Sequence, residues 1–250
     1  RQMCIRDSPS IIYASGKGSR MKEISKLPKP LIKVGKQSLI SLMLNKMPID
    51  ISKSNIVINS ESKGIKEIHK EFSFSEIKNT ESQLESILET KDLIKKQKSF
   101  LLCSCDCFGF YDKISLDKKI SRNQFDIICF GFNPSLMQNK IGGNSFFTPK
   151  GESVLKIHVK SKENKNDLGL AGFFWIKDGK SFCKMTEDIK HKIIGSEREI
   201  IADDIIMTAI NKGFKIGYEL LNQYIHLGSV YELSEYLYWL EGIKNLNKIL

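Results

Sequence analysis

Short apolar runs alternate along the chain with segments in which apolar residues recur every three or four positions. The apolar runs predict buried strands at residues 11–14, 55–59, 100–104, 125–130, 154–159 and 170–176. The three-to-four spacing predicts helices at residues 37–47, 61–70, 181–193 and 199–212, after Thr80 and after Ser229. We therefore predict one α/β domain, with a mainly parallel mixed sheet flanked by helices on both faces.

Two of the predicted helices begin with a capping-box pattern, in which a polar residue three positions into the helix bonds back to the cap. Gln83 follows Thr80 by three residues, and Glu232 follows Ser229 by three. The inward faces of these helices carry Leu84, Ile87, Leu88 and Ile94, and Leu233, Tyr236, Leu237 and Leu240. In the strand at 154–159, alternation predicts one face with Leu155, Ile157 and Val159 and the other with Lys156 and His158.

The chain has 250 residues, of which 41% are hydrophobic, enough for a single domain with a sizeable core. No apolar run approaches the roughly 20 residues that span a bilayer, and no secretory apolar region is evident. Residues 1–8 follow no strand or helix period, and the first residue is not methionine. We interpret residues 1–8 as an artefact or a disordered extension, assign the domain to residues 9–250, and expect no membrane partner.

The net charge is +10, and the lysines that dominate it are spread along the whole chain. A nucleic-acid-binding protein more often concentrates such residues in a stripe with interleaved aromatic side chains. The charge therefore favours anionic small substrates over nucleic acid.

Six cysteines lie at positions 4, 103, 105, 107, 129 and 183. Cys103, Cys105 and Cys107 alternate, so we expect them on one face of a strand. Zinc ligation is one interpretation, but no Cys-x-x-Cys or paired-histidine spacing supports it. We favour small buried thiols in a reducing cytoplasm.

A phosphate-binding pattern, ASGKGSRM at residues 14–21, follows the first predicted strand. Its two glycines permit a tight turn whose backbone N–H groups can point at an anion. Arg20 adds a forked donor suited to phosphate oxygens. Lys29 stands between Pro28 and Pro30, which restrict the backbone on both sides. We predict a polyphosphate site at this loop.

The glycine pattern has other interpretations. A Gly-x-Gly sequence alone also fits an ordinary strand-to-helix turn with solvated basic side chains. The chain has no Gly-Lys-Ser/Thr for a P-loop, and Met21 stands where a dinucleotide fingerprint would want its third glycine. The longer pattern, with Arg20 and Lys29, favours the polyphosphate site.

Asp106 follows the apolar strand at 100–104. In open α/β sheets, ligands bind outside the carboxyl ends of the strands, where the glycine loop is also expected. Mg²⁺ prefers one or two carboxylates together with substrate phosphates and water. We predict that Asp106 is a magnesium ligand; a turn or capping aspartate is the alternative.

Residues 14–21 and the sequence Pro28-Lys29-Pro30-Leu31 resemble the N-terminal signature of the sugar-phosphate nucleotidyltransferases, in the nucleoside-triphosphate transferase family. Weaker matches in the right order extend the resemblance over nearly all of residues 11–239, and the segment at Asp106 is similar to the branch associated with surface polysaccharides. The resemblance implies that Arg20, Lys29 and Asp106 are catalytic and that Asp106 carries Mg²⁺, or Mn²⁺. It implies nucleotide-binding residues Ala14, Gly16, Gly18, Ser19 and Gln83.

The resemblance implies a sugar-phosphate site made by Lys160 or Lys162, Gly172 and His226. Ser82 stands where the family usually has glycine, and Val159 and Ser161 stand where it has a glutamate before the phosphate-binding lysine. His226 stands where many members have a second metal carboxylate. We expect His226 to line the same crevice as Asp106 and to contact the sugar or pack, rather than to bind metal.

The function implied by the resemblance is transfer of a nucleoside monophosphate from an NTP to a sugar 1-phosphate, with release of pyrophosphate. A glycosyltransferase of the same architecture is an alternative, but it would want Asp-x-Asp at the strand end, and Asp106-Cys107-Phe108 does not provide it. A non-catalytic nucleotide-binding relative is the other alternative, motivated by Ser82, Val159 and His226.

Overall fold

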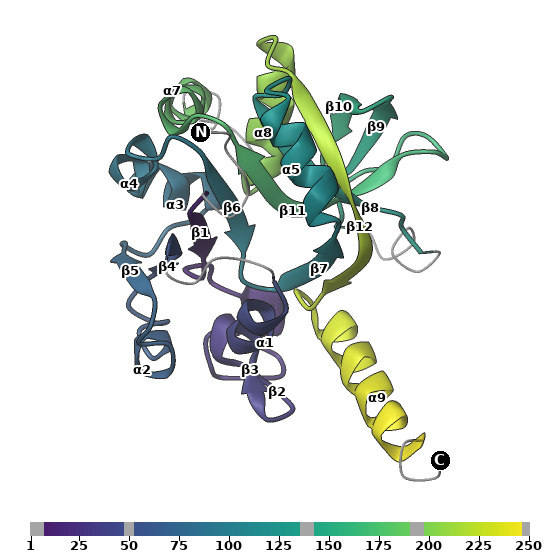
Figure 1. Ribbon diagram of the computed structural model, residues 1–250. Coiled ribbons are helices and arrows are strands. Elements are labelled where there is room, and N and C mark those ends of the chain that lie inside the picture. The colour runs from purple at the N-terminus through teal and green to yellow at the C-terminus, as the bar shows by residue number, and fades with distance from the viewer. Residues whose placement is uncertain (1–7, 48–52, 136–142, 191–197, 247–250) are drawn as a thin grey trace.

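The computed structural model describes residues 8–47, 53–135, 143–190 and 198–246. The main strands are β1 Ser10–Tyr13, β4 Asn55–Ile58, β5 Ser73–Glu76, β6 Phe100–Ser104, β7 Cys107–Tyr111, β8 Ile127–Phe132, β9 Phe146–Lys150, β10 Ser153–His158, β11 Leu168–Ile176 and β12 Ile216–His226. They form one ten-stranded mixed sheet in the order β5-β4-β1-β6-β11-β8-β12-β10-β9, with β7 paired to β12 (Figure 1). A small hairpin pairs β2 (Lys33–Val34) with β3 (Gln37–Ser38).

The parallel part of the sheet positions the candidate site. Strands β5, β4, β1 and β6 run parallel, whereas β11 is antiparallel to both β6 and β8. Tyr13, the last residue of β1, lies in register with Ser104, the last residue of β6. The glycine loop and Asp106 therefore both begin at the same edge of the sheet.

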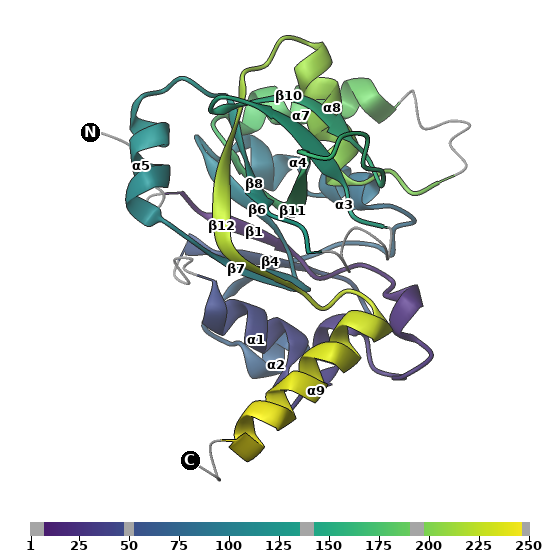
Figure 2. The same ribbon diagram turned by 90° about the vertical axis from the view of Figure 1, so that its right-hand side faces the viewer.

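Helices cover both faces of the sheet, as the alternation of strands and helices predicts (Figure 2). They are α1 Leu39–Lys46, α2 Ile65–Ile68, α3 Gln83–Glu89, α4 Lys91–Lys95, α5 Lys113–Ser121, α7 Gly179–Lys190, α8 Ala202–Asn211 and α9 Val230–Leu246. Alternate residues of β1 enter different cores, because Ile12 packs with α1 and Ile11 packs with α3, α7 and α8. The mixed α/β sheet flanked by helices is confirmed.

The helix predicted after Thr80 begins later and is interrupted. Ser82, not Thr80, is the N-cap of α3, and its hydroxyl accepts a hydrogen bond from the N–H of Glu85 at 3.2 Å. The hydroxyl of Thr80 instead contacts that of Ser86 at 2.6 Å. Thr90 separates α3 from α4, and its hydroxyl bonds back to the Ser86 carbonyl at 3.1 Å, a pattern that competes with helix continuation. By contrast, the cap predicted at Ser229 is present.

The predicted alternation in β10 is wrong. A register shift between Val154 and Lys156 turns the strand, so Val154 is buried while Leu155 is 54% exposed. His158 is buried, with Nε2 at 3.0 Å from the Thr148 hydroxyl. The apolar alternation could not reveal this shift, because a bulge changes which residues face the core.

The ends of the described chain differ in how they pack. Ser8 is buried, and its hydroxyl accepts from the indole N–H of Trp175 at 3.1 Å, so the prediction that it belongs to an extension outside the domain is wrong. Residues 1–7, and the predicted helical residues 191–193, lie outside the described residues. Helix α9 extends away from the sheet, with Leu233 packed in the core (Figure 1). Across the described ranges, no helix is long and apolar enough to cross a membrane.

Candidate active site

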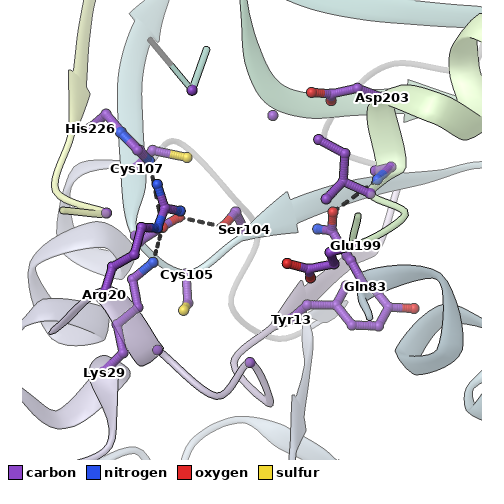
Figure 3. A pocket seen from close by; sticks show the side chains of 18 of the residues that line it. Tyr13, Arg20, Lys29, Gln83, Ser104, Cys105, Cys107, Glu199, Asp203 and His226 are labelled. Atoms are coloured by element: carbon purple, nitrogen blue, oxygen red, sulfur yellow. Dashed lines mark hydrogen bonds and ion pairs between the residues drawn. The ribbon is translucent and has the colours of Figure 1, made fainter. Parts of the chain in front are cut away.

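The glycine loop turns back over Lys29. Gly18 has φ +57°, and a Cβ at this position would lie 2.6 Å from the Cβ of Lys29. Glycine is therefore needed for both the backbone conformation and the close approach. The loop leads into a 3₁₀ turn, η2 (Ser19–Met21), that carries Arg20, and Lys29 begins a second turn, η3 (Lys29–Leu31). Arg20 and Lys29 converge at the mouth of the loop (Figure 3).

Asp106 is the buried centre of this group. One of its carboxylate oxygens, Oδ2, forms an ion pair with the ammonium of Lys29, and the other, Oδ1, accepts from the hydroxyl of Ser104. The Nε2 atom of His226 lies 3.6 Å from Oδ2. The Asp106 side chain is only 8% exposed, so these contacts take the place of water.

The charges in this group support one another. Burial by itself would raise the pKa of Asp106, but the charge of Lys29 and the hydrogen bond to His226 hold this pKa well below its usual value. Burial opposes the charge of Lys29 as well, yet Asp106 outweighs it and raises the pKa of Lys29. Desolvation lowers the pKa of His226, but Asp106 and Glu232 raise it to about 9. At neutral pH, Asp106 thus lies between two cations.

His226, at the end of β12, is held from its far side. Its Nδ1 atom lies 2.7 Å from Glu232, and Glu232 also accepts from the hydroxyl of Ser229 at 2.7 Å. Gly228 has no left-handed φ; a Cβ there would lie 2.3 Å from His226 Nε2 and 2.8 Å from Asp106 Oδ2. Glycine at this position therefore serves the close approach of His226 and Asp106, not a turn.

A cavity of about 370 Å³ opens in front of these residues. Of the residues singled out from the sequence, its wall includes Gly16, Gly18, Ser19, Arg20, Lys29 and Gln83, and also Asp106, Lys160, Gly172 and His226. Two residues lie elsewhere. Ala14 is buried, with its N–H bonded to the Val57 carbonyl, and Lys162 lies over the ring of Phe146. The resemblance included both, because sequence spacing cannot specify which way a side chain points.

The start of α3 closes one side of the cavity. The amide oxygen of Gln83 accepts a hydrogen bond from the N–H of Ala202 at 2.9 Å, so Gln83 ties α3 to the start of α8. Its NH₂ group is then the end that remains to donate to a ligand. Lys17 of the glycine loop forms an exposed ion pair with Glu81, which joins the loop to the same region.

Several polar residues on the cavity wall were not singled out from the sequence. Ser104 orients Asp106, and Asp203 and Glu199 come from the start of α8 and the residues before it. Ser104 could have been found, since it is the last residue of the apolar strand before Asp106. Asp203 carried no such signal, because acidic residues are common in the first turn of any helix.

The donor set fits a divalent cation only with help from a substrate. Within residues 8–47, 53–135, 143–190 and 198–246, no group of three or more His, Cys, Asp or Glu side chains is arranged to hold a metal ion. Asp106 supplies one carboxylate at the cavity, and Mg²⁺ accepts one carboxylate when phosphates and water complete its shell. The clustered cysteines are buried as free thiols, and burial raises the pKa of Cys105 to about 12, which disfavours the thiolate that zinc would need.

The two glycines of the loop are expected to respond differently to alanine. Gly18→Ala should lower the free energy of unfolding by about 2 kcal/mol, because it adds both backbone strain and a clash with Lys29. Gly16→Ala is the matched control: a Cβ there meets no atom within 4 Å, so stability should change by less than about 0.5 kcal/mol. Urea unfolding of the two variants measures the difference; equal losses would contradict this loop geometry.

Comparisons with known proteins support the fold. No protein-family model matches the chain, and no curated protein sequence matches it. Many solved structures do match, and three of them serve as examples. They are the inositol-1-phosphate CTP transferase from T. maritima (15% identity, 95% of this chain and 96% of that one, TM-score 0.71), a UDP-glucose pyrophosphorylase complexed with UDP-glucose (15%, 96% and 99%, 0.73), and the CTP:phosphocholine cytidylyltransferase from Streptococcus pneumoniae (17%, 93% and 99%, 0.66). Together with the order of strands and the buried Asp106 group, these matches show that the chain has the fold of the sugar-phosphate nucleotidyltransferases.

Proposed function

We propose that this protein transfers a nucleoside monophosphate from an NTP to a sugar 1-phosphate and releases pyrophosphate. The observation that carries the proposal is the meeting of Lys29 and Asp106 at the mouth of the glycine loop, where β1 and β6 end side by side. This arrangement places cations and a carboxylate around the space that a triphosphate would occupy. The fold shared with known nucleotidyltransferases supports the same reaction.

The reaction needs positioning and charge neutralisation rather than a covalent intermediate. An oxygen of the acceptor phosphate attacks the α-phosphorus, and the bond to the β-phosphate oxygen breaks. Backbone N–H groups of the glycine loop hold the triphosphate, and Arg20 holds the departing pyrophosphate. Lys29 neutralises charge near the α-phosphate and the incoming phosphate. Mg²⁺ or Mn²⁺ held by Asp106 would supply additional positive charge to the phosphates.

The acceptor is assigned to the part of the cavity wall formed by Lys160 and Gly172. Lys160 lies in the turn that follows β10 and has φ +53°, an uncommon conformation for a lysine. It also lies on the cavity wall. Gly172 lies on the same wall, where a Cβ would meet no protein atom within 4 Å. We assign Lys160 to the acceptor phosphate and the space beside Gly172 to the sugar. The resemblance to the surface-polysaccharide branch makes precursors of such polysaccharides the products to test first.

The test is a pyrophosphate-release screen of the common NTPs against sugar 1-phosphates, with Mg²⁺ and with Mn²⁺. Release that requires both an NTP and a sugar 1-phosphate is the expected result. Release of a nucleoside diphosphate from a nucleotide sugar would instead identify a glycosyltransferase. Nucleotide binding without turnover for any pair would identify a non-catalytic relative.

The two lysines suggested by the resemblance provide a matched comparison. Lys160→Ala should raise the KM for the sugar 1-phosphate by about tenfold, because a charge-assisted phosphate contact is lost. Lys162→Ala should change this KM by less than about twofold, because Lys162 lies over Phe146 and away from the cavity wall. Steady-state kinetics with the acceptor identified in the screen decides between them. A larger effect at Lys162 would reverse the assignment.

A further inference from the structure

One carboxylate on the cavity wall has no part in the proposed phosphate chemistry. Asp203 lies in the first turn of α8, with its carboxylate directed into the cavity (Figure 3). In this view it lies across the cavity from Arg20 and Lys29. It is therefore remote from the charges that would bind the triphosphate.

Asp203 is held in place by a short chain of hydrogen bonds. The hydroxyl of Ser145 donates to the Asp203 carboxylate and accepts from the backbone N–H of Lys160 at 3.2 Å. The carbonyl of Ser145 is fixed in turn by the N–H of Leu170 in β11, at 2.8 Å. Asp203 is thus oriented by the same turn that carries Lys160.

Among the described residues, the carboxylate of Asp203 has one side-chain hydrogen-bond donor, the Ser145 hydroxyl. Burial raises its pKa to about 6, although the Ser145 hydroxyl opposes the rise and Asp204 adds to it. The guanidinium of Arg198 binds Asp204, through NH1 at 2.9 Å. An ionised carboxylate accepts about four hydrogen bonds, so within the described part of the chain one hydroxyl leaves most of its capacity for a ligand in the cavity.

Resting on the proposed function, we propose that Asp203 accepts hydrogen bonds from ring hydroxyls of the acceptor and so determines its class. The acceptor is a polyhydroxylated phosphate ester, a sugar or cyclitol phosphate. A quaternary ammonium ester has no N–H or O–H to give, and it prefers aromatic faces. Lys160, close enough to Asp203 to lower its pKa, would also repel such a cation. Val159, next to Lys160, has no side-chain acceptor, so the carboxylate comes from α8 instead.

The test combines enzyme variants with acceptor analogues. The acceptor found in the screen, each of its monodeoxy analogues and phosphocholine are assayed with wild type, Asp203→Ala and Asp203→Asn. For wild type, kcat/KM with one analogue should fall by about 10- to 100-fold, because the half-buried carboxylate of Asp203 is left without its donor. For Asp203→Ala, kcat/KM with the full acceptor should fall by a similar factor. Removal of the hydroxyl in that analogue should then cause no further loss. The KM for the NTP should stay unchanged.

Controls separate this role from a structural one. Asp188→Asn, on α7 and paired with Lys212 away from the cavity wall, should show the wild-type pattern. Asp203→Asn keeps the shape of the side chain, and its thermal unfolding shows whether a loss reflects folding. The proposal would be overturned if each analogue lowered kcat/KM equally in wild type and in a folded Asp203→Asn or Asp203→Ala variant. It would also be overturned if phosphocholine were the best acceptor. Absence of pyrophosphate release with every pair would overturn the proposed function and the role of Asp203 with it.

Discussion

Asp106→Asn is expected to lower kcat by about 10³-fold, several kcal/mol of transition-state stabilisation, because the carboxylate that would hold the metal ion is lost. It is also expected to lower the free energy of unfolding by about 3 kcal/mol at neutral pH. The reason is that the Lys29 ammonium, 14% exposed, loses its partner and remains a buried charge. Single-turnover kinetics and urea unfolding measure the two effects separately.

A second substitution separates catalysis from stability. In the double variant Asp106→Asn with Lys29→Met, both charges of the pair are absent, and methionine replaces the apolar stem of the lysine. Its stability should return to within about 1 kcal/mol of wild type, or exceed it, whereas activity should remain lost. Near-wild-type turnover of Asp106→Asn would remove Asp106 from the catalytic group. A double variant no more stable than the single one would mean that Lys29 does not depend on Asp106.

The ligand-free protein is expected to lose stability as the pH rises from about 6.5 to about 9. His226 has its pKa raised from 6.5 to about 9 in the folded chain, so its stabilising charge is fully present below 6.5 and is lost through 9. This shift corresponds to about 3 kcal/mol. On the acid side, Asp106 and Glu232 have lowered pKa values, so their contribution is present above their usual values and is lost as the pH falls.

His226→Gln is the matched control for this pH dependence. The variant should be less stable than wild type at about pH 6 and nearly equal to it at about pH 9.5, because wild-type His226 is then neutral. Urea unfolding at several pH values measures both curves. Parallel curves for the two proteins would show that His226 is not the titrating group.

Parts of the fold and of the site were predictable because their signals are local. The run at residues 100–104 is apolar throughout and became β6, and Asp106 follows it directly. Strands β7 and β12 were not predicted, although β7 begins directly after Asp106 and β12 ends at His226. In β12, exposed residues such as Leu220 and Gln223 interrupt the alternation of buried and exposed positions, so the sequence pattern alone does not identify a strand. The strand forms because it pairs with β7 and β8.

The α/β class, the glycine loop and the proline-framed Lys29 that follows it could be predicted from the sequence alone. These features depend on residues close together in the chain, where glycine, proline and apolar spacing act directly on the backbone. The 3.6 Å approach of His226 to Asp106 and the place of Lys160, not Lys162, on the cavity wall follow from packing and could not be predicted from the sequence. The same holds for Asp203, brought to the cavity by α8. Such contacts join residues far apart in the chain, and they exist only once strand register and helix packing have specified where each side chain points.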